Sequence, residues 1–236
     1  MMKLTYLFHS GFLIEANGFA IVCDYYRAGE TILDELLRRR QPLYVLVSHE
    51  HRDHYNPEVL AWSRQNGDIH YIFPREMSVR PELSALPNVV FLDRGESYAD
   101  GRVQVTAFGS TDLGVSYEIV TEGKALFHAG DLNNWHWRDE STEAEVRAAE
   151  MAYRRELDYM AESITHIDVA MFPVDARLGS DYMRGAGQFV ERFTVNCFIP
   201  MHFYPAIRKA EAFAPIARQH GAEFVLLAHT GDSITI

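Results

Sequence analysis

Five apolar residues in a row, at positions 43–47, place the tightest constraint on how this chain folds. A continuous apolar run of this length is expected of a β-strand that is buried on both of its faces. The residues that follow are strongly polar, and three of the chain's 11 histidines fall within six of them: His49, His51 and His54. The sequence therefore predicts a buried strand whose end delivers a cluster of imidazole groups.

Segments typical of strands and helices alternate along both halves of the chain. We expect strands at residues 4–8, 12–16, 19–25, 43–47, 69–73, 89–92, 103–108, 115–121, 125–128, 167–172, 197–201 and 224–228. We expect helices at residues 30–40, 57–65, 143–163, 187–193 and 206–220. This order favours an α/β chain of the α+β kind, a four-layer αββα sandwich, over a simple doubly wound sheet. Because no linker or repeat stands out, residues 1–236 are predicted to form a single domain.

Two of these helices carry more detailed expectations. Asn56 and Pro57 are typical of an N-cap and a first helical position, so the helix that they open should begin at residue 57. The longest helix, at 143–163, is rich in charge and should bury one stripe of apolar side chains. Its expected inner positions are Ala148, Met151, Ala152, Leu157 and Met160.

The charge balance and the cysteines indicate which binding partners and which cellular compartment to expect for this protein. The 22 basic and 33 acidic residues leave a net charge of −11, which argues against non-specific binding to nucleic acid or to anionic membranes. The first ten residues lack a secretory signal, and no apolar run approaches the roughly 20 residues of a membrane span. We therefore expect a cytoplasmic protein, in which Cys23 and Cys197 are buried free thiols rather than a disulfide. Its expected partners are a small-molecule substrate and, as an open alternative, further copies of itself.

The histidine cluster has the spacing of a metal site. In an extended segment, residues two apart point the same way, so His49 and His51 can present their imidazoles to one ion. Asp53 and His54 follow as the chain turns, and from there they can reach a second ion or orient a bound water. Borderline cations such as zinc favour nitrogen and carboxylate ligands of this kind. A divalent metal site is therefore predicted here.

The His-x-His-x-Asp-His pattern at residues 49–54 resembles the signature of the metallo-β-lactamase superfamily. Within that superfamily, the chain is most similar to the metal-dependent hydrolases related to L-ascorbate-6-phosphate lactonase. Residues 7–15 resemble the first hairpin of this group, and residues 21–24 its next strand, which ends in an aspartate. Residues 126–131 resemble the strand that ends in Gly-Asp, and residues 198–203 the late strand that supplies the last histidine ligand.

This resemblance implies an αββα fold and a hydrolase that works with one or two divalent ions, zinc being expected and manganese or iron being alternatives. It implies His49 and His51 as ligands of the first ion, Asp53, His54 and His202 as ligands of the second, and Asp131 as the bridge between them. A hydroxide on the ions would attack a lactone, an ester or a phosphodiester of a small polar or phosphorylated molecule. Asp53 and Asp131 are the expected catalytic carboxylates.

The chain departs from the family pattern at one position. The superfamily supplies a third histidine to the first ion from a His-Ser step, and the matching residues here are Gly109 and Ser110. Asp112 or His136 could complete the site, or the protein could work with one ion. A site with only two imidazoles favours a harder ion or additional waters over tightly held zinc. The alternative function is that of a metal-binding protein with little or no hydrolytic activity.

Several further residues have weaker claims to the site. His9 and Asp24 are expected to hydrogen-bond to the ligand imidazoles and orient them rather than to bind the ions. The two tryptophans in residues 133–137 could either cap the core or form a wall of a substrate pocket. Asp175 and Arg177 follow another strand, where Arg177 could hold an anionic substrate group or form a surface ion pair with an acidic residue.

Overall fold

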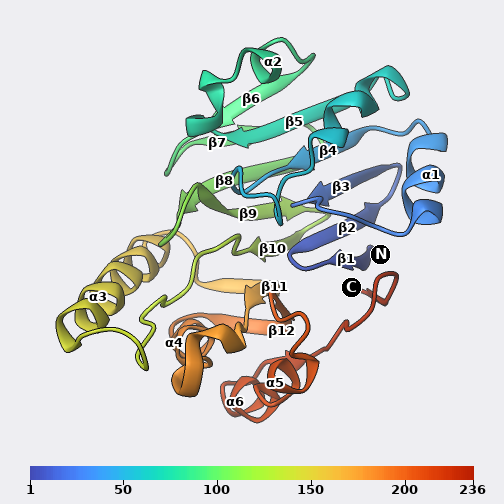
Figure 1. The fold of residues 1–236 in the computed structure, drawn as a ribbon. Helices are drawn as coiled ribbons and strands as arrows, with labels where there is room; N and C mark the ends of the chain where they lie inside the picture. Colours follow the sequence, from blue (N-terminus) through green and yellow to red (C-terminus); the bar gives the residue numbers. More distant parts are fainter. The chain divides into compact units, whose positions relative to one another are not determined.

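The chain builds two seven-stranded sheets, one in each of two compact units, as the computed structural model shows (Figure 1). Unit 1 comprises Met1–Asp93 and Leu227–Ile236, and unit 2 comprises Arg94–Leu226. The structure describes residues 1–236, apart from the side chain of Glu30.

The sheet of unit 1 combines an antiparallel first half with a parallel second half. Its strands are β1 (Lys3–Phe8), β2 (Gly11–Ala16), β3 (Phe19–Cys23), β4 (Leu43–Leu46), β5 (Ile69–Pro74), β6 (Val89–Leu92) and β14 (Ser233–Thr235). The order across the sheet is β14-β1-β2-β3-β4-β5-β6, and pairing becomes parallel from β3 onward. Because β14 pairs with β1, the two chain termini lie side by side (Figure 1).

Helical segments cover one face of this sheet. They are α1 (Glu30–Arg38), η1 (Pro57–Arg64), η2 (Arg75–Val79) and α2 (Pro81–Ser84). Leu37 of α1 and Trp62 of η1 belong to the same buried cluster as Val45 of β4, so the helices pack onto the sheet through apolar side chains. All four residues of β4 are at most 1% exposed, which confirms that this strand is buried on both faces.

The sheet of unit 2 repeats the plan of the first one. Its strands are β7 (Ser97–Ala99), β8 (Val103–Gly109), β9 (Val115–Thr121), β10 (Lys124–His128), β11 (His166–Pro173), β12 (Thr194–Met201) and β13 (Glu223–Phe224). The first four strands form an antiparallel meander, and β10, β11, β12 and β13 are parallel neighbours. In both units, therefore, a run of antiparallel strands is followed by three parallel connections that contain helices.

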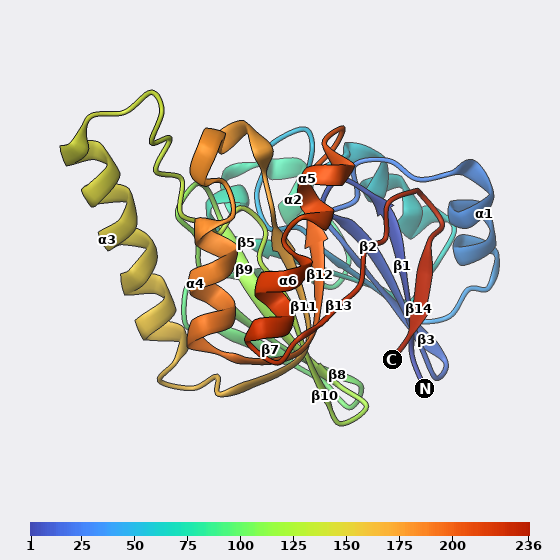
Figure 2. The same cartoon turned by 90° about the horizontal axis from the view of Figure 1, so that it is seen from below.

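The helices of unit 2 gather on one side of its sheet (Figure 2). They are α3 (Glu143–Met160), η3 (Ala176–Asp181), α4 (Arg184–Arg192), α5 (Ile207–Glu211) and α6 (Ala214–Gln219). Phe189 of α4 packs against Phe127 and Phe172 of the sheet, with ring centroids 5.3 and 4.5 Å apart. Fully buried aromatic rings thus fix α4 on the central strands of unit 2.

Four of the local expectations need correction. The helix after Asn56 is a 3₁₀-helix, although the Asn56 side chain caps it as expected. The helix expected at 206–220 is divided into α5 and α6, because Pro215 is tolerated only in the first turn of a helix. The strand expected at 224–228 is reduced to Glu223–Phe224. The strands β7 and β14 were not anticipated, since both are only three residues long.

The buried stripe of α3 was assigned in part to the wrong residues. Leu157 and Met160 are buried as expected, but Ala148, Met151 and Ala152 are exposed. Val146 and Tyr153 take their place, and the Tyr153 hydroxyl donates a hydrogen bond to the Gly185 carbonyl oxygen. A tyrosine can lie in a core when its hydroxyl finds such a partner, and this partner is not visible in the sequence.

These observations confirm a mixed α/β fold with two sheets. Cys23 and Cys197 are free thiols as expected, but only Cys23 is buried, because Cys197 is partly exposed on β12. Among the residues that the structure describes, none of the helices is both long and apolar enough to cross a membrane.

Candidate metal centre

In unit 1, the histidine cluster leaves the carboxyl end of the buried strand β4, where ligands gather in open sheets. His49 is fully buried and His51 is exposed, yet His49 Nε2 lies only 2.9 Å from His51 Nδ1. His49 Nδ1 lies 2.9 Å from the Ser48 hydroxyl, which itself donates to a carboxylate, so Nδ1 carries the proton. The lone pair of His49 is therefore on Nε2, and it faces the imidazole of His51.

Asp24 is buried at the end of the neighbouring strand β3 and holds this loop in place. Its carboxylate accepts hydrogen bonds from the Ser48 backbone N–H and hydroxyl, at 2.7 and 2.6 Å. The same carboxylate lies 2.7 Å from His54 Nδ1. Because Nδ1 of His54 is occupied in this way, Nε2 is the nitrogen that can coordinate an ion. Asp24 thus makes the hydrogen bond to a histidine of the motif that the sequence analysis expected of it.

His9 and Asp53 form the second contact of unit 1. His9 Nε2 lies 3.2 Å from Asp53 Oδ2, and His9, Asp53 and His54 each offer an atom within 4.8 Å of the others. The hydrogen bond from His9 holds the pKa of the Asp53 carboxyl well below its usual range, against the opposing effect of partial burial. Asp53 is therefore an anionic oxygen donor across the physiological pH range.

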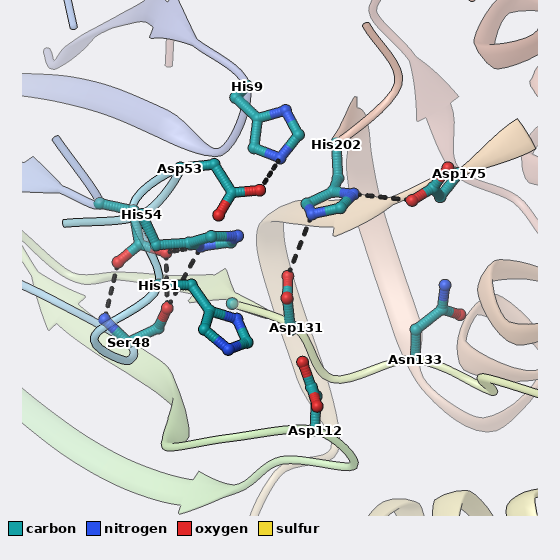
Figure 3. Close-up of polar contacts among 12 residues, drawn as sticks. His9, Ser48, His51, Asp53, His54, Asp112, Asp131, Asn133, Asp175 and His202 are labelled. Carbon is teal, nitrogen blue, oxygen red and sulfur yellow. Dashed lines mark hydrogen bonds and ion pairs between the residues drawn. The ribbon is translucent and has the colours of Figure 1, made fainter. Parts of the chain in front are cut away.

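In unit 2, the corresponding groups lie at the ends of the parallel strands β10, β11 and β12. Asp131 follows β10 after Gly130, whose φ of 54° is a left-handed conformation that glycine adopts without strain. His202 follows β12, and its Nε2 lies 3.4 Å from Asp131 Oδ1 (Figure 3). Both residues are more than nine-tenths buried. Strand pairing thus brings together two residues that are 71 positions apart in the chain.

Asp175, at the end of β11, stands behind His202 as Asp24 stands behind His54. Its carboxylate lies 2.9 Å from His202 Nδ1. It also accepts hydrogen bonds from the Arg177 guanidinium, at 2.5, 2.8 and 3.1 Å, and from the Arg177 backbone N–H at 2.9 Å. Burial alone would raise the pKa of Asp175, but the contacts with His202 and Arg177 outweigh it and lower the pKa to about 2. Of the two roles considered for Arg177, the structure shows the ion pair.

Sequence reasoning missed two of these supporting groups, Ser48 and the contact of Asp175 with His202. Ser48 lies between the buried strand and the first histidine, so its position next to the motif was the only available signal. For Asp175 the signal was its place directly after a strand, which becomes specific only once β11 is known to pair with β12.

Three residues of this set adopt left-handed backbone conformations that are uncommon outside glycine. The φ angles of His9, Asp24 and His202 are 59°, 44° and 59°. Such conformations carry a small energetic cost and are concentrated at functional sites, where the surrounding structure enforces them. Each of the three is the first residue after a strand, and the sharp change in chain direction there sets the orientation of the side chain.

Asp112 and His136, the two groups considered for the missing ligand, differ in their surroundings. The carboxylates of Asp112 and Asp131 each offer an oxygen, and these atoms lie within 4.8 Å of one another. His136 is buried with both ring nitrogens engaged: Nδ1 accepts a hydrogen bond from the Arg138 N–H at 3.0 Å, and Nε2 lies 3.2 Å from the Asp181 carbonyl oxygen. Only Asp112 therefore has donor atoms directed toward the other candidate ligands of unit 2.

The two tryptophans lie beside the candidate ligands of unit 2. Trp135 and Trp137 stack with their ring planes 19° apart, and both are half-buried. The Trp135 indole N–H donates to the Asp131 carbonyl oxygen at 2.7 Å, and its ring meets the His202 ring edge-on. An aromatic surface thus borders Asp131 and His202.

Taken unit by unit, the structure brings together the residues of each half of the predicted set. His9, His49, His51, Asp53 and His54 meet at one edge of the unit 1 sheet, with Asp24 behind them. Asp112, Asp131 and His202 meet in unit 2, with Asp175 behind His202, whereas His136 faces Arg138 and Asp181. Imidazole nitrogens and carboxylate oxygens form a donor set that suits divalent transition metals.

A family profile described as Beta-lactamase superfamily domain matches residues 3–202. Because this match covers most of the chain, the protein belongs to the β-lactamase superfamily. Together with its two-sheet fold and the names of its relatives, this makes it a metal-dependent hydrolase of that superfamily.

The curated relatives carry the same class of name. A UPF0173 metal-dependent hydrolase of Symbiobacterium thermophilum is 26% identical, over 100% of both chains. A UPF0173 protein of Pyrococcus furiosus is 25% identical, over 86% of this chain and 83% of its own length.

Two solved structures share the fold. Igni18, a metallo hydrolase from Ignicoccus hospitalis, has a TM-score of 0.73 at 19% identity and covers 100% of this chain and 98% of its own. CmlA, a diiron β-hydroxylase from Streptomyces venezuelae, has a TM-score of 0.74 at 14% identity and covers 100% of this chain but 54% of its own. At these identities the similarity establishes the fold and says nothing about the reaction.

Proposed function

We propose that the protein hydrolyses a small polar or phosphorylated molecule, such as a lactone, an ester or a phosphodiester, at a centre of one or two divalent ions. The observation that carries this proposal is a repeated contact, His54 with Asp24 in unit 1 and His202 with Asp175 in unit 2. A buried carboxylate behind an imidazole fixes its tautomer and increases the basicity of the other ring nitrogen, as is usual for metal-binding histidines. Each unit supplies one such histidine.

The proposed ligands follow the superfamily motif. They are His49 and His51 for the first ion, Asp53, His54 and His202 for the second, and Asp131 as the bridge. The donor chemistry of each unit supports this assignment, because the coordinating nitrogens of His49, His54 and His202 are all set by a hydrogen bond on the opposite side of the ring. Zinc fits the imidazole-rich part of the set, and manganese or iron fits its carboxylates.

The chain's own residues have separable roles in the reaction. Divalent ions, when bound, lower the pKa of water toward neutrality and polarise the oxygen of the group under attack. Asp53, kept ionised by His9, would orient the attacking water, and Asp131 would supply a carboxylate ligand to the metal centre. Asp24 and Asp175 keep their histidines in the coordinating tautomer, while Arg177 keeps Asp175 ionised.

The substrate is proposed to lie against Trp135 and Trp137, whose stacked rings border Asp131 and His202. An aromatic wall excludes water and gives a small molecule a large contact area. The resemblance of the sequence motifs to those of the lactonase-related hydrolases favours a small polar or phosphorylated substrate. A substrate with an anionic group is compatible with the net charge of −11, because the ions offset the acidic groups locally.

One observation favours the second candidate, a metal-binding protein with little or no turnover. Gly109 stands where the superfamily has a histidine ligand, so the first ion has fewer imidazoles than usual. A metal site that lacks one ligand binds its ion less tightly, so the site is occupied only in part. The two candidates are separated by whether the metal-loaded protein turns over any substrate.

The test is a hydrolysis screen with chromogenic phosphodiesters, lactones and thioesters, on protein freed of metal and reloaded with zinc, manganese or iron. The proposal predicts activity that needs the ion and that falls by at least about 10³-fold in Asp131→Ala, as expected when an essential group is removed. Asp158→Ala, which removes an exposed carboxylate on α3, is the matched control and should keep full activity. Metal-loaded protein without turnover would favour the second candidate, and equal activity in Asp131→Ala would refute the assignment.

A further inference from the structure

The position of the missing histidine is already filled by another side chain. Gly109 is the last residue of β8, and a Cβ atom built on it would lie 2.7 Å from the carboxyl carbon of Glu156 on α3. Real Cβ atoms essentially never come this close to another heavy atom. A histidine at 109 would therefore require Glu156 to move away.

An ion pair holds the Glu156 side chain in this position. The Arg94 guanidinium donates to its carboxylate at 3.0 Å, and Arg94 itself stacks on the ring of Tyr159, one turn further along α3. Moving Glu156 away would break this ion pair, which is one of the two contacts that Arg94 makes with α3. Glycine at 109 is thus part of how α3 packs on β8, rather than an isolated loss of a ligand.

The loop that follows Gly109 is fastened to the segment that carries Asp131. The Thr111 hydroxyl donates to the Asn133 carbonyl oxygen at 2.5 Å and accepts from the Asn133 N–H at 3.0 Å. These two bonds tie the residue before Asp112 to the second residue after Asp131. As a result, the two aspartates offer oxygens within 4.8 Å of one another, close to the span of two ligands that each lie about 2.1 Å from one ion.

We infer that Asp112 shares a divalent ion with Asp131, in place of the ligand that the superfamily takes from position 109, and that this ion is a harder divalent cation, Mn²⁺ or Fe²⁺, in preference to Zn²⁺. The inference rests on the proposed function. His136 is excluded as the replacement because its ring nitrogens face the Arg138 N–H and the Asp181 carbonyl oxygen, neither of which belongs to a candidate ligand. Two imidazoles with two carboxylates make an oxygen-richer set than three imidazoles with one, and ligand type is what separates these metals.

The first experiment measures metal binding rather than turnover. Metal-free wild type, Asp112→Ala, Asp131→Ala and the control Asp158→Ala are titrated with Mn²⁺ and with Zn²⁺ by calorimetry, with stoichiometry checked by elemental analysis. The inference predicts that Asp112→Ala weakens Mn²⁺ binding by at least about 10-fold and weakens Zn²⁺ binding less. Unchanged Mn²⁺ binding in Asp112→Ala, or an equal loss for both metals, would overturn it.

The variants also separate this inference from the proposed function. If Asp131→Ala loses metal while Asp112→Ala does not, the metal centre stands and the role of Asp112 is refuted. If wild type binds neither Mn²⁺ nor Zn²⁺, the proposed function fails and the inference fails with it.

A second experiment tests the exclusion at position 109. Gly109→Ala is expected to lower Tm by about 1–3 °C, the worth of a partly exposed ion pair in a chain of this size. In a Glu156→Ala background the same substitution should leave Tm unchanged, because the obstructing carboxylate is gone. Equal shifts in the two backgrounds would show that Glu156 does not close this position.

Discussion

His54 and His202 are held in the same way, although they lie in different units of the chain. Each follows a parallel strand, and each directs Nδ1 to a buried aspartate at the end of the neighbouring strand. Because a parallel strand places its carboxyl end beside that of its neighbour, the pairing partner is the natural source of such a support. The order of strands in each sheet thus determines which aspartate hydrogen-bonds to each histidine.

Removing this support should weaken metal binding without abolishing it. We expect Asp24→Asn and Asp175→Asn each to raise the Kd for the ion by about 10- to 100-fold, because an amide does not stabilise the coordinating tautomer as a carboxylate does. Asp158→Asn on the exposed surface of α3 should leave Kd unchanged. Calorimetric titration with Zn²⁺ checks this, and a Kd unaltered in both buried variants would contradict the orienting role.

A second prediction at this scale concerns Glu118 on β9, which is partly buried. Burial raises the pKa of its carboxyl, so the native state binds the proton more tightly than the unfolded chain does. As the pH rises above the ordinary pKa of glutamate, the charged Glu118 side chain lowers the free energy of unfolding. Glu118→Gln removes this charge and should therefore stabilise the protein at pH 7. The gain should be small, about 0.5 kcal/mol, because the side chain keeps some contact with water.

The stabilisation by Glu118→Gln should grow as the pH rises. Below about pH 4 both states carry the proton, so the advantage of Glu118→Gln should disappear there. Thermal melts between pH 3.5 and pH 8 measure the difference in Tm, with the exposed Glu162→Gln as the control. A stabilisation of the same size at every pH would contradict the desolvation argument.

The residues of the motif could be predicted because they are local in sequence. His49, His51, Asp53 and His54 fall within six positions, and one strand end orders all of them. The hydrogen-bond partners of the ligands depend instead on strand pairing between distant segments, as with Asp175 and His202. The packing around position 109 was equally hidden, since the side chain that an added Cβ would meet there, Glu156, lies on a helix 47 positions away.

At the scale of elements, α3 begins where the sequence placed it and buries a different stripe. Thr142 and Glu145 form a reciprocal capping box, with the Glu145 N–H donating to the Thr142 hydroxyl and the Thr142 N–H donating to the Glu145 carboxylate. A cap is a local signal and is readable from the sequence, whereas the buried face depends on what the helix packs against. Tyr153 is buried because Gly185 offers a carbonyl oxygen to its hydroxyl.

The capping box gives a stability prediction. Thr142→Ala should destabilise the protein by about 1 kcal/mol, since it leaves N–H groups of the first turn without their partner. Ser141→Ala, one residue earlier, removes a hydroxyl outside the box and should change stability little. Urea denaturation measures both, and equal effects would show that the box does not hold the start of α3.

At the scale of the whole molecule, the two units follow the same strand plan, and each has candidate metal ligands beyond the carboxyl ends of its parallel strands. The mixed α/β class and the two sheets were predictable, because helices are inserted among strands in both halves of the chain. The closure of the first sheet by β14 was not, because its pairing with β1 joins segments about 230 residues apart. Long-range pairing of a three-residue strand leaves no pattern in the sequence.

Removal of the metal should lower the thermal stability of the protein. An ion that binds the native state but not the unfolded chain adds about 2.7 kcal/mol at 100 times its Kd, which corresponds to a Tm increase of about 5–10 °C for a chain of this size. Chelation by EDTA should therefore lower Tm of wild type by that amount and leave Asp131→Ala nearly unaffected. The same shift in both proteins would mean that the chelator acts elsewhere.

The central claim, a divalent metal centre built from these histidines and aspartates, is tested most directly by counting bound ions. Elemental analysis of the purified protein, before and after reconstitution, should find one or two divalent ions per chain and fewer in His54→Ala and in Asp131→Ala. Asp158→Ala should match wild type. A wild-type protein that neither retains nor takes up a divalent ion, or variants that bind as much metal as wild type, would contradict the account.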